Sequence, residues 1–372
     1  MSQTAVRCML IRGGTSKGAY FLAEDLPDDP ARRDAMLLTL MGSPDPAQID
    51  GLGGGHPLRS KVAIVQKSSR PGIDVDFLFA QVSVDRPIVD TSPNCGNILA
   101  GVGPFAIERG LVPAQDGTTN VRVRTLNTGT VADLIVRTPH RQVAYDGEAR
   151  IDGVPGASAP IQVYFENAAG SSCGALLPTG HVRDEIDEVE VTCIDNGMPV
   201  IVIPASAVGI SGYESVAELN ADVRLKARLE RIRHAAGPMM NLGDVTDAVV
   251  PKISLIAAPK HGGSIATRTF IPRTCHTSIG VFGAVSVATA CVLPGSVADG
   301  IAVVTLADTV ALSVEHPTGE FTVSLELDRR GERPIVTRAG LVRTARVLFD
   351  GVAFARPHFE TVPAMAGIGD LP

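Results

Sequence analysis

Short apolar runs separated by turn residues dominate the chain, a pattern typical of a protein built mainly of β-strands. The pair Asn196-Gly197 lies between two such runs and predicts a hairpin turn. The apolar and β-branched runs predict strands at residues 5–11, 19–22, 60–65, 74–84, 121–125, 131–136, 142–145, 161–165, 189–195, 199–204, 253–257, 301–306, 311–316, 320–327, 335–338 and 343–349. Residues from 357 onward predict an irregular surface segment.

Helical patterns interrupt these strands at four places. Residues 29–41 show helical periodicity up to Gly42, and residues 221–235 form an amphipathic, arginine-rich pattern with its charges on a solvated face. Residues 96–110 are small or apolar up to Glu108, the pattern of a helix surrounded by protein. A similar uncharged stretch ends at Ala290, with Thr277 or Ser278 expected as its N-cap.

Cys95 stands in a polar turn directly before the first uncharged helix. Unpaired N–H groups and the positive end of the helix dipole favour a thiolate at such a position, so Cys95 is a candidate nucleophile or acid/base. Asn94 and Asn97 add amide donors, and Gly96 permits close approach to the backbone. A buried, unreactive cysteine beside an Asx-type turn is the alternative.

Residues 12–18, Arg-Gly-Gly-Thr-Ser-Lys-Gly, connect two predicted strands. The amides of Gly13 and Gly14, the hydroxyls of Thr15 and Ser16, and the Lys17 amine suit an anion. The spacing is not that of a P-loop, and a plain hairpin turn is the alternative.

A second glycine-rich loop, residues 49–56, leads to Ser60 and Lys61 at the start of a strand. His56 stands where the dinucleotide-binding pattern requires glycine, so Rossmann-type binding is disfavoured. Lys61 could reach into a cleft where desolvation favours the neutral amine that a general base needs. A solvated lysine is the alternative.

The second half of the chain repeats the cysteine-then-helix pattern. Cys275 follows Cys95 by 180 residues, and Gly103 and Gly283 keep the same offset. This indicates a weak internal duplication. Two halves, each a sheet around a buried helix, would direct both helix N-termini into one anion-binding cleft.

Composition narrows the class of protein. The chain has 372 residues, which predicts two domains, and its 45% apolar content with 20% charged residues fits a globular fold. A net charge of −7 argues against nucleic acid or anionic membranes as partners. Six scattered cysteines without Cys-x-x-Cys spacing predict free thiols and no metal site, and the start of the chain lacks a secretory signal, so we expect a cytoplasmic protein.

Six motifs together resemble the methylaconitate isomerase and 4-oxalomesaconate tautomerase family, distant relatives of diaminopimelate epimerase. They are Arg12 to Gly18, Asp50 to Gly54, Ser60-Lys61, Asn94 to Asn97, Asn241 to Asp244 and the helix start at Cys275-His276. The resemblance spans nearly the whole chain. The segments 50–61 and 94–110 look most similar to the 4-oxalomesaconate tautomerases of gallate and protocatechuate breakdown.

The resemblance implies an α/β (α+β) fold of two pseudo-symmetric halves, residues 1–165 and 166–372, with a terminal strand that can cross over. Each half would be a curved, mostly antiparallel sheet around a central buried helix, with the active site in the cleft between them. It implies Lys61 and Cys95 as catalytic residues, no metal and no organic cofactor. Expected substrate-binding residues are Gly13, Gly14, Thr15, Ser16, Lys17, Gly53, Gly54, Ser60, Asn94, Gly96, Asn97, His276, Thr277 and Ser278.

The implied reaction is a keto-enol tautomerisation or 1,3-allylic proton shift of a small unsaturated tricarboxylate, 4-oxalomesaconate, by an enzyme that could be a homodimer. Epimerases carry Gly-Thr-Gly or a similar segment after their second catalytic cysteine, whereas here His276-Thr277-Ser278 follows Cys275. That departure favours one lysine and one cysteine. The alternatives are a 2-methylaconitate cis/trans isomerase, a two-cysteine amino-acid racemase or epimerase, and a binding module without activity.

Overall fold

The computed structural model describes residues 3–166, 168–331 and 334–356, and the chain divides into two compact units. Of the described residues, those up to 163 and those from 343 onward form unit 1, and those between 164 and 342 form unit 2. The last strand, β16 (Ile335–Ala355), contributes residues 335–342 to unit 2 and residues 343–355 to unit 1. The predicted boundary at 165–166 lies two residues from the observed change of unit, and the C-terminal strand returns to unit 1.

Unit 1 is a mostly antiparallel sheet with strand order β1-β2-β3-β4-β6-β7-β8, in which the β2–β3 and β4–β6 pairs are parallel and β16 pairs with β1. Its elements are β1 (Thr4–Gly13), β2 (Ser16–Leu22), η1 (Ala23–Asp25), α1 (Pro30–Met41), η2 (Pro57–Arg59), β3 (Lys61–Lys67), β4 (Val75–Val82), β5 (Val89–Asp90), α2 (Gly96–Glu108), β6 (Gly117–Thr125), β7 (Val131–Thr138), η3 (Pro139–Arg141) and β8 (Pro160–Phe165), the last at the unit boundary.

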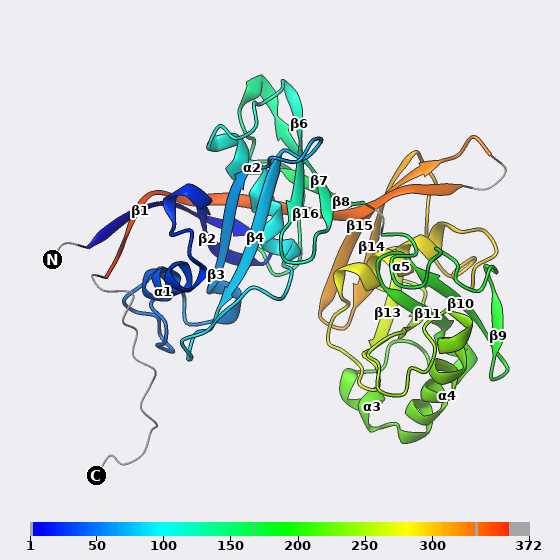
Figure 1. Cartoon of the computed structure of the whole chain (residues 1–372). Coiled ribbons are helices and arrows are strands. Elements are labelled where there is room, and N and C mark those ends of the chain that lie inside the picture. The colour runs from blue at the N-terminus through cyan, green and yellow to red at the C-terminus, as the bar shows by residue number, and fades with distance from the viewer. Residues whose placement is uncertain (1–2, 167, 332–333, 357–372) are drawn as a thin grey trace, which may run out of the picture. The chain divides into compact units, whose positions relative to one another are not determined.

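Helix α2 is the centre of unit 1 and contacts β1, β2, β3, β4, β6 and β7 (Figure 1). Residues 98–106 of this helix are all buried, as its uncharged sequence predicts. Glycines permit the close packing: a Cβ atom at Gly101 would lie 2.3 Å from the Tyr20 hydroxyl oxygen, and one at Gly103 would lie 2.8 Å from Val136 Cγ2. The strands therefore approach the helix backbone more closely than alanine would allow.

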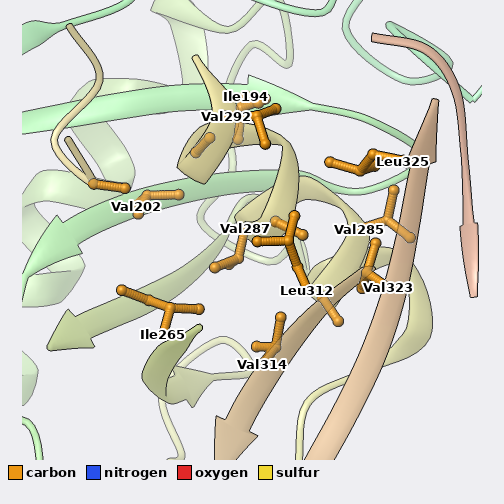
Figure 2. Close-up of a cluster of buried hydrophobic side chains, with 14 of the residues drawn as sticks. Ile194, Val202, Ile265, Val285, Val287, Val292, Leu312, Val314, Val323 and Leu325 are labelled. Atoms are coloured by element: carbon orange, nitrogen blue, oxygen red, sulfur yellow. The ribbon is translucent and has the colours of Figure 1, made fainter. Parts of the chain in front are cut away.

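Unit 2 has the strand order β16-β15-β14-β13-β12-β11-β10-β9. Its elements are β9 (Asp184–Ile186), β10 (Val189–Asp195), β11 (Pro199–Pro204), η4 (Ala205–Val208), α3 (Val216–Ala221), α4 (Val223–Met239), β12 (Lys252–Ala257), β13 (Ile265–Phe270), α5 (Val281–Val292), β14 (Thr309–His316) and β15 (Gly319–Asp328). Helix α5 contacts β10, β11, β14 and β15, and Figure 2 shows its valines among side chains of these strands. The other face of the sheet packs against α4.

The predicted fold class is confirmed: both units are mostly antiparallel sheets that surround one buried helix. Helix 29–41 is confirmed as α1, with Asp29 as N-cap and Gly42 in the left-handed conformation at its C-terminus. The hairpin at Asn196-Gly197 is also confirmed, since β10 and β11 pair on either side of it. Among the described residues, no helix is long and apolar enough to cross a membrane.

Several predicted elements were wrong. Residues 142–145 and 301–306 are irregular, and Val303 is 64% exposed, so its apolar run finds no sheet to pack on. The strands expected at 335–338 and 343–349 are one strand, because β15 pairs with the first part of β16 and β1 with the second. The segment from 357 lies outside the described residues.

The arginine-rich helix also differs from its prediction. Asp222 caps α4 and separates it from the short helix α3. Arg233, expected on a solvated face, is fully buried, and its guanidinium donates to the Glu230 carboxylate and the Val245 carbonyl. A buried guanidinium with these partners is a structural group, which amphipathic periodicity alone does not reveal.

Candidate active site

Cys95 is the N-cap residue of α2, as the sequence predicts. Its backbone is extended, with φ −138° and ψ 99°, and the residue is partly exposed. Within the described parts of the chain, no side chain caps the first turn of this helix. The N–H groups of that turn and the positive end of the helix dipole are therefore available to stabilise negative charge close to the thiol.

Tyr20 and Arg343 are two titratable groups that interact with Cys95 through their charges. Burial lowers the pKa of Arg343 to about 10, and the charge interaction with Cys95 opposes that change. Tyr20 is fully buried, which raises its pKa well above the usual value, and its hydroxyl donates to the Ile98 carbonyl at 2.6 Å. Cys95 thus has a buried cation and a neutral phenol as neighbours.

The turn at Gly14 and Thr15 between β1 and β2 lies beside the start of α2. The Asn97 side-chain amide donates to the Thr15 hydroxyl at 2.9 Å, and its nitrogen lies 3.5 Å from the Ser16 hydroxyl. A Cβ atom at Gly13 would lie 2.2 Å from the Asn97 carbonyl oxygen, and Gly14 has φ +51°. Residues 13–16 form the tight hairpin turn that was the alternative to an anion-binding loop. This turn packs directly against the N-terminus of α2. Lys17, in β2, is half-buried.

Lys61 begins β3 on the side of the sheet that faces α2. It pairs in register with Gly18, at which an added Cβ atom would lie 2.8 Å from the Lys61 carbonyl and 3.0 Å from Ile98 Cδ1. The Lys61 side chain is buried, with its Nζ 5.0 Å from the centre of the Phe79 ring. The solvated alternative for Lys61 is therefore excluded, and the amine belongs to the same end of unit 1 as the α2 N-terminus.

The second glycine loop is arranged around one buried side chain, Gln48. Its amide donates to the Ser60 hydroxyl at 2.7 Å and accepts from the Gly55 N–H, and a Cβ atom at Gly53 would lie 2.2 Å from it. Ser60 is fully buried and its hydroxyl donates to the Val82 carbonyl. In this structure Ser60 and Gly53 stabilise the second glycine-rich loop through their contacts with the Gln48 side chain. An added Cβ atom at Gly54 would lie 3.0 Å from Arg59 Cβ.

The polar turn before Cys95 is fixed by Asn127, a residue that sequence reasoning missed. Its amide exchanges two hydrogen bonds with the backbone of Phe79 and donates a third to the Thr91 carbonyl at 2.7 Å. Asn94 is exposed and its side chain donates to the Thr128 hydroxyl at 2.6 Å. Gly96 is the first residue of α2. The loop 126–130 thereby sets the position of the Cys95 turn.

In unit 2 the corresponding turn is built differently. Helix α5 begins after Gly280, so the expectation that Thr277 or Ser278 caps it is wrong. Cys275 is 2% exposed, and burial raises the pKa of its thiol to about 11. Its backbone N–H donates to the Asn220 side chain at 2.7 Å. Cys275 is a buried thiol held in a turn ahead of the helix.

His276, Thr277 and Ser278 lie in this same turn. The Ser278 N–H donates to His276 Nδ1 at 3.1 Å, and the Thr318 hydroxyl donates to the Thr277 carbonyl at 2.9 Å. The Ser278 hydroxyl is 3.3 Å from Nε2 of His316, a residue that was predicted as part of a strand and not as part of the site. These three residues form one polar cluster in unit 2, and their role in binding substrate stays a prediction.

Unit 1 therefore brings together Cys95, Gly96, Asn97, Lys61 and the 13–17 hairpin at one end of α2. No group of three or more His, Cys, Asp or Glu side chains suited to a metal ion occurs among the described residues. Arg343 is a neighbour of Cys95, and Gln81 is a neighbour of Lys61, but neither belongs to a motif that the sequence shows. Gln81 could have been predicted only from the strand register that pairs it with Lys61.

A buried amine and a thiol on the N-cap residue, at the same end of an α/β unit, are groups of the kind that a proton-transferring enzyme uses as base and acid. The chain belongs to the family described as PrpF protein, whose match covers residues 3–356.

Three known proteins are similar to the chain along nearly its whole length. It is 58% identical over 352 residues to the 4-oxalomesaconate tautomerase of Pseudomonas putida strain KT2440, covering 95% of this chain and 96% of that protein. It is 59% identical over 347 residues to the (4E)-oxalomesaconate Delta-isomerase of Novosphingobium sp. strain KA1, covering 93% of this chain and 96% of that protein. The crystal structure of a methylitaconate-delta-isomerase superposes with a TM-score of 0.85 and 31% identity, covering 99% of this chain and all of that one.

These findings confirm the resemblance stated from the motifs, and the chain is an isomerase. The chain also shares the fold of the methylitaconate-delta-isomerase over nearly its whole length.

Proposed function

We propose that the protein isomerises 4-oxalomesaconate, a step of gallate or protocatechuate breakdown, by moving a proton within the conjugated system of this unsaturated tricarboxylate. The observation that carries the proposal is the pairing, in one unit, of a thiol at the N-cap of α2 with the buried amine of Lys61. A 1,3-shift needs one group to remove a proton from carbon and one to deliver a proton elsewhere. Lys61 and Cys95 supply these two groups.

In the proposed reaction Lys61 takes a proton from a carbon of the substrate, and the electron pair left behind delocalises onto the keto oxygen as a dienolate. Cys95 then delivers a proton to another atom of the same conjugated system. No atom is lost and no electron leaves the substrate, so the reaction needs no redox partner. After each turnover the Lys61 ammonium releases one proton to water and the Cys95 thiolate takes one from water, which restores both groups. The α2 N-terminus, the 13–17 hairpin and the buried Arg343 stabilise the carboxylates and the dienolate.

The experiment follows the ultraviolet absorbance of 4-oxalomesaconate with Lys61→Ala and Cys95→Ser proteins. Each change should lower kcat/KM by about a thousandfold, the size expected for losing a general acid or base. Lys67→Ala is the matched control, because Lys67 lies on the same strand, is exposed and donates to the Leu111 carbonyl. Near wild-type rates for both site variants would overturn the proposal.

Two side assays separate the alternatives. A 2-methylaconitate isomerase would convert that tricarboxylate faster than 4-oxalomesaconate in the same buffer. A binding module would take up the substrate without exchanging its carbon-bound protons with deuterated water, which proton magnetic resonance detects.

A further inference from the structure

Gln81 on β4 lies directly opposite Lys61 on β3. The Lys61 Nζ donates to Gln81 Oε1 at 2.8 Å, and the same Nζ lies over the Phe79 ring. Phe79 and Gln81 are two residues apart on one strand, so both side chains project from the same face of the sheet. The amine of Lys61 therefore rests between an amide oxygen and an aromatic face.

The orientation of the Gln81 amide is fixed by its other end. Its Nε2 donates to the Ser60 carbonyl at 2.8 Å and to the Pro57 carbonyl at 3.1 Å. Both protons of the amide are used in these two bonds, since a primary amide nitrogen carries two. A flipped amide would place its oxygen against two carbonyl oxygens, so Gln81 can offer Lys61 only an acceptor.

We propose that Gln81 is a positioning residue for Lys61 in the isomerisation, an inference that rests on the proposed function. A base must exist as a neutral amine before it takes a proton and as an ammonium afterwards. An amide oxygen accepts one hydrogen bond from either form and carries no net charge. Gln81 thus holds the amine in place without locking it as an ammonium, which a carboxylate at the same distance would do.

Other titratable groups on the elements near Lys61 and Gln81 are Lys17 and Tyr20 on β2, Arg59 in η2, Asp90 on β5 opposite Gln81, and Cys95 at the start of α2. All five are unchanged in variants of Gln81. A difference in pH profile between such variants and the wild type therefore reports the amide itself.

The test measures kcat and KM for 4-oxalomesaconate from pH 5 to pH 10 in the Gln81→Glu and Gln81→Met proteins. The acidic limb of the kcat/KM profile reports the base of the free enzyme. Glu should move that limb to higher pH by about one unit or more, because a carboxylate favours the ammonium. Met removes the acceptor and should move the limb to lower pH, with kcat reduced about tenfold or more and KM changed less.

Thermal unfolding shows which variants are folded before their profiles are compared. If Gln81→Glu does not fold because its carboxylate faces the Ser60 and Pro57 carbonyls, the Gln81→Met profile decides the question alone. Gln142→Glu, a charge change at an exposed glutamine, should leave the profile unchanged. Profiles of folded Gln81 variants that superpose on the wild type would overturn the inference.

The Lys61→Ala protein separates this inference from the proposed function. If Lys61→Ala keeps its activity, the proposed function fails whatever the Gln81 variants do. If Lys61→Ala is inactive while the Gln81 profiles do not move, the proposed function stands and only the positioning role fails.

Discussion

The two central helices occupy equivalent places in their units, yet their N-termini differ. In unit 1 the cysteine is the N-cap itself, partly exposed and next to the buried Arg343. In unit 2 four residues separate Cys275 from Gly280, the N-cap residue of α5, and the thiol is buried. The two units share the arrangement of a sheet around a central helix, but the position and exposure of the cysteine differ. A central helix that resembles α2 is therefore not sufficient to indicate a second reactive thiol.

The helices also pack by different means. Glycines at 101 and 103 bring α2 close to the strands around it. Helix α5 instead uses hydroxyl groups: Ser286 accepts from the Asn196 N–H and donates to the Met198 carbonyl, and Thr289 accepts from the Asn196 side-chain amide. Strand side chains such as Tyr20 and Val136 pack directly on the backbone of α2, whereas α5 is hydrogen-bonded to the turn between β10 and β11.

The largest expected effect tests the chemical difference directly. Cys95→Ser should lower kcat/KM by about a thousandfold, whereas Cys275→Ala should stay within a few-fold of the wild type. The reason is that only Cys95 lies at a helix N-terminus beside a buried cation. The measurement is the tautomerase assay on proteins with matched unfolding curves. Complete loss of activity in a folded Cys275→Ala protein would instead support the two-cysteine racemase mechanism.

A second prediction concerns alkylation of the native protein. Because the pKa of Cys275 is raised to about 11, only about one thiol in a thousand is ionised at pH 8, and the side chain is 2% exposed. Iodoacetamide should modify Cys95 at least about a hundredfold faster than Cys275, and Cys275 labelling should rise as the pH approaches 11. Peptide mass spectrometry after timed quenching gives both rates. Equal alkylation rates of Cys95 and Cys275 at pH 8 would show that the two thiols do not differ in accessibility and reactivity.

Local sequence predicted one of these turns and not the other. Asn94-Cys95-Gly96 before an uncharged run is sufficient to indicate the start of α2. Thr277 and Ser278 are equally good capping residues by type. The turn around Cys275 is held by Asn220, and Thr318 binds the Thr277 carbonyl, so α5 starts later. Tertiary contacts of this kind override local preference and leave no trace in a short window of sequence.

The neighbours of the candidate catalytic groups could not be predicted from the sequence either, because their roles also depend on tertiary contacts. Gln81 acquires its role from the register of β3 and β4. Arg343 belongs to unit 1 because the second part of β16 pairs with β1. Asn127 acts through the backbone of Phe79. Residues with unusual neighbours in the sequence, such as Cys95, can be predicted from motifs, whereas residues that acquire their role through strand pairing cannot.

Glycine substitutions in α2 and α5 test how the two helices pack, and their expected effects on stability are smaller than the effects on activity and alkylation above. Gly101→Ala should destabilise the protein by about 1–3 kcal/mol, because the new Cβ atom displaces the Tyr20 hydroxyl from the Ile98 carbonyl. Gly283→Ala should be neutral or stabilising by up to about 1 kcal/mol, since its Cβ atom would lie 3.5 Å from Ile279 and alanine favours helix. Urea unfolding measures both. Equal losses at the two positions would contradict the packing distinction.

The smallest expected effect separates a residue of the candidate site from a residue of the turn. Asn220 accepts from the Cys275 N–H and donates to its carbonyl, so Asn220→Ala should lower the free energy of unfolding by about 1–2 kcal/mol. Its kcat/KM should not change. Asn97→Ala removes the bond to the Thr15 hydroxyl and should lower kcat/KM about tenfold with a similar or smaller loss of stability. If Asn220→Ala lowers kcat/KM as much as Asn97→Ala does, the turn at Cys275 takes part in the reaction and the distinction between the two helix starts fails.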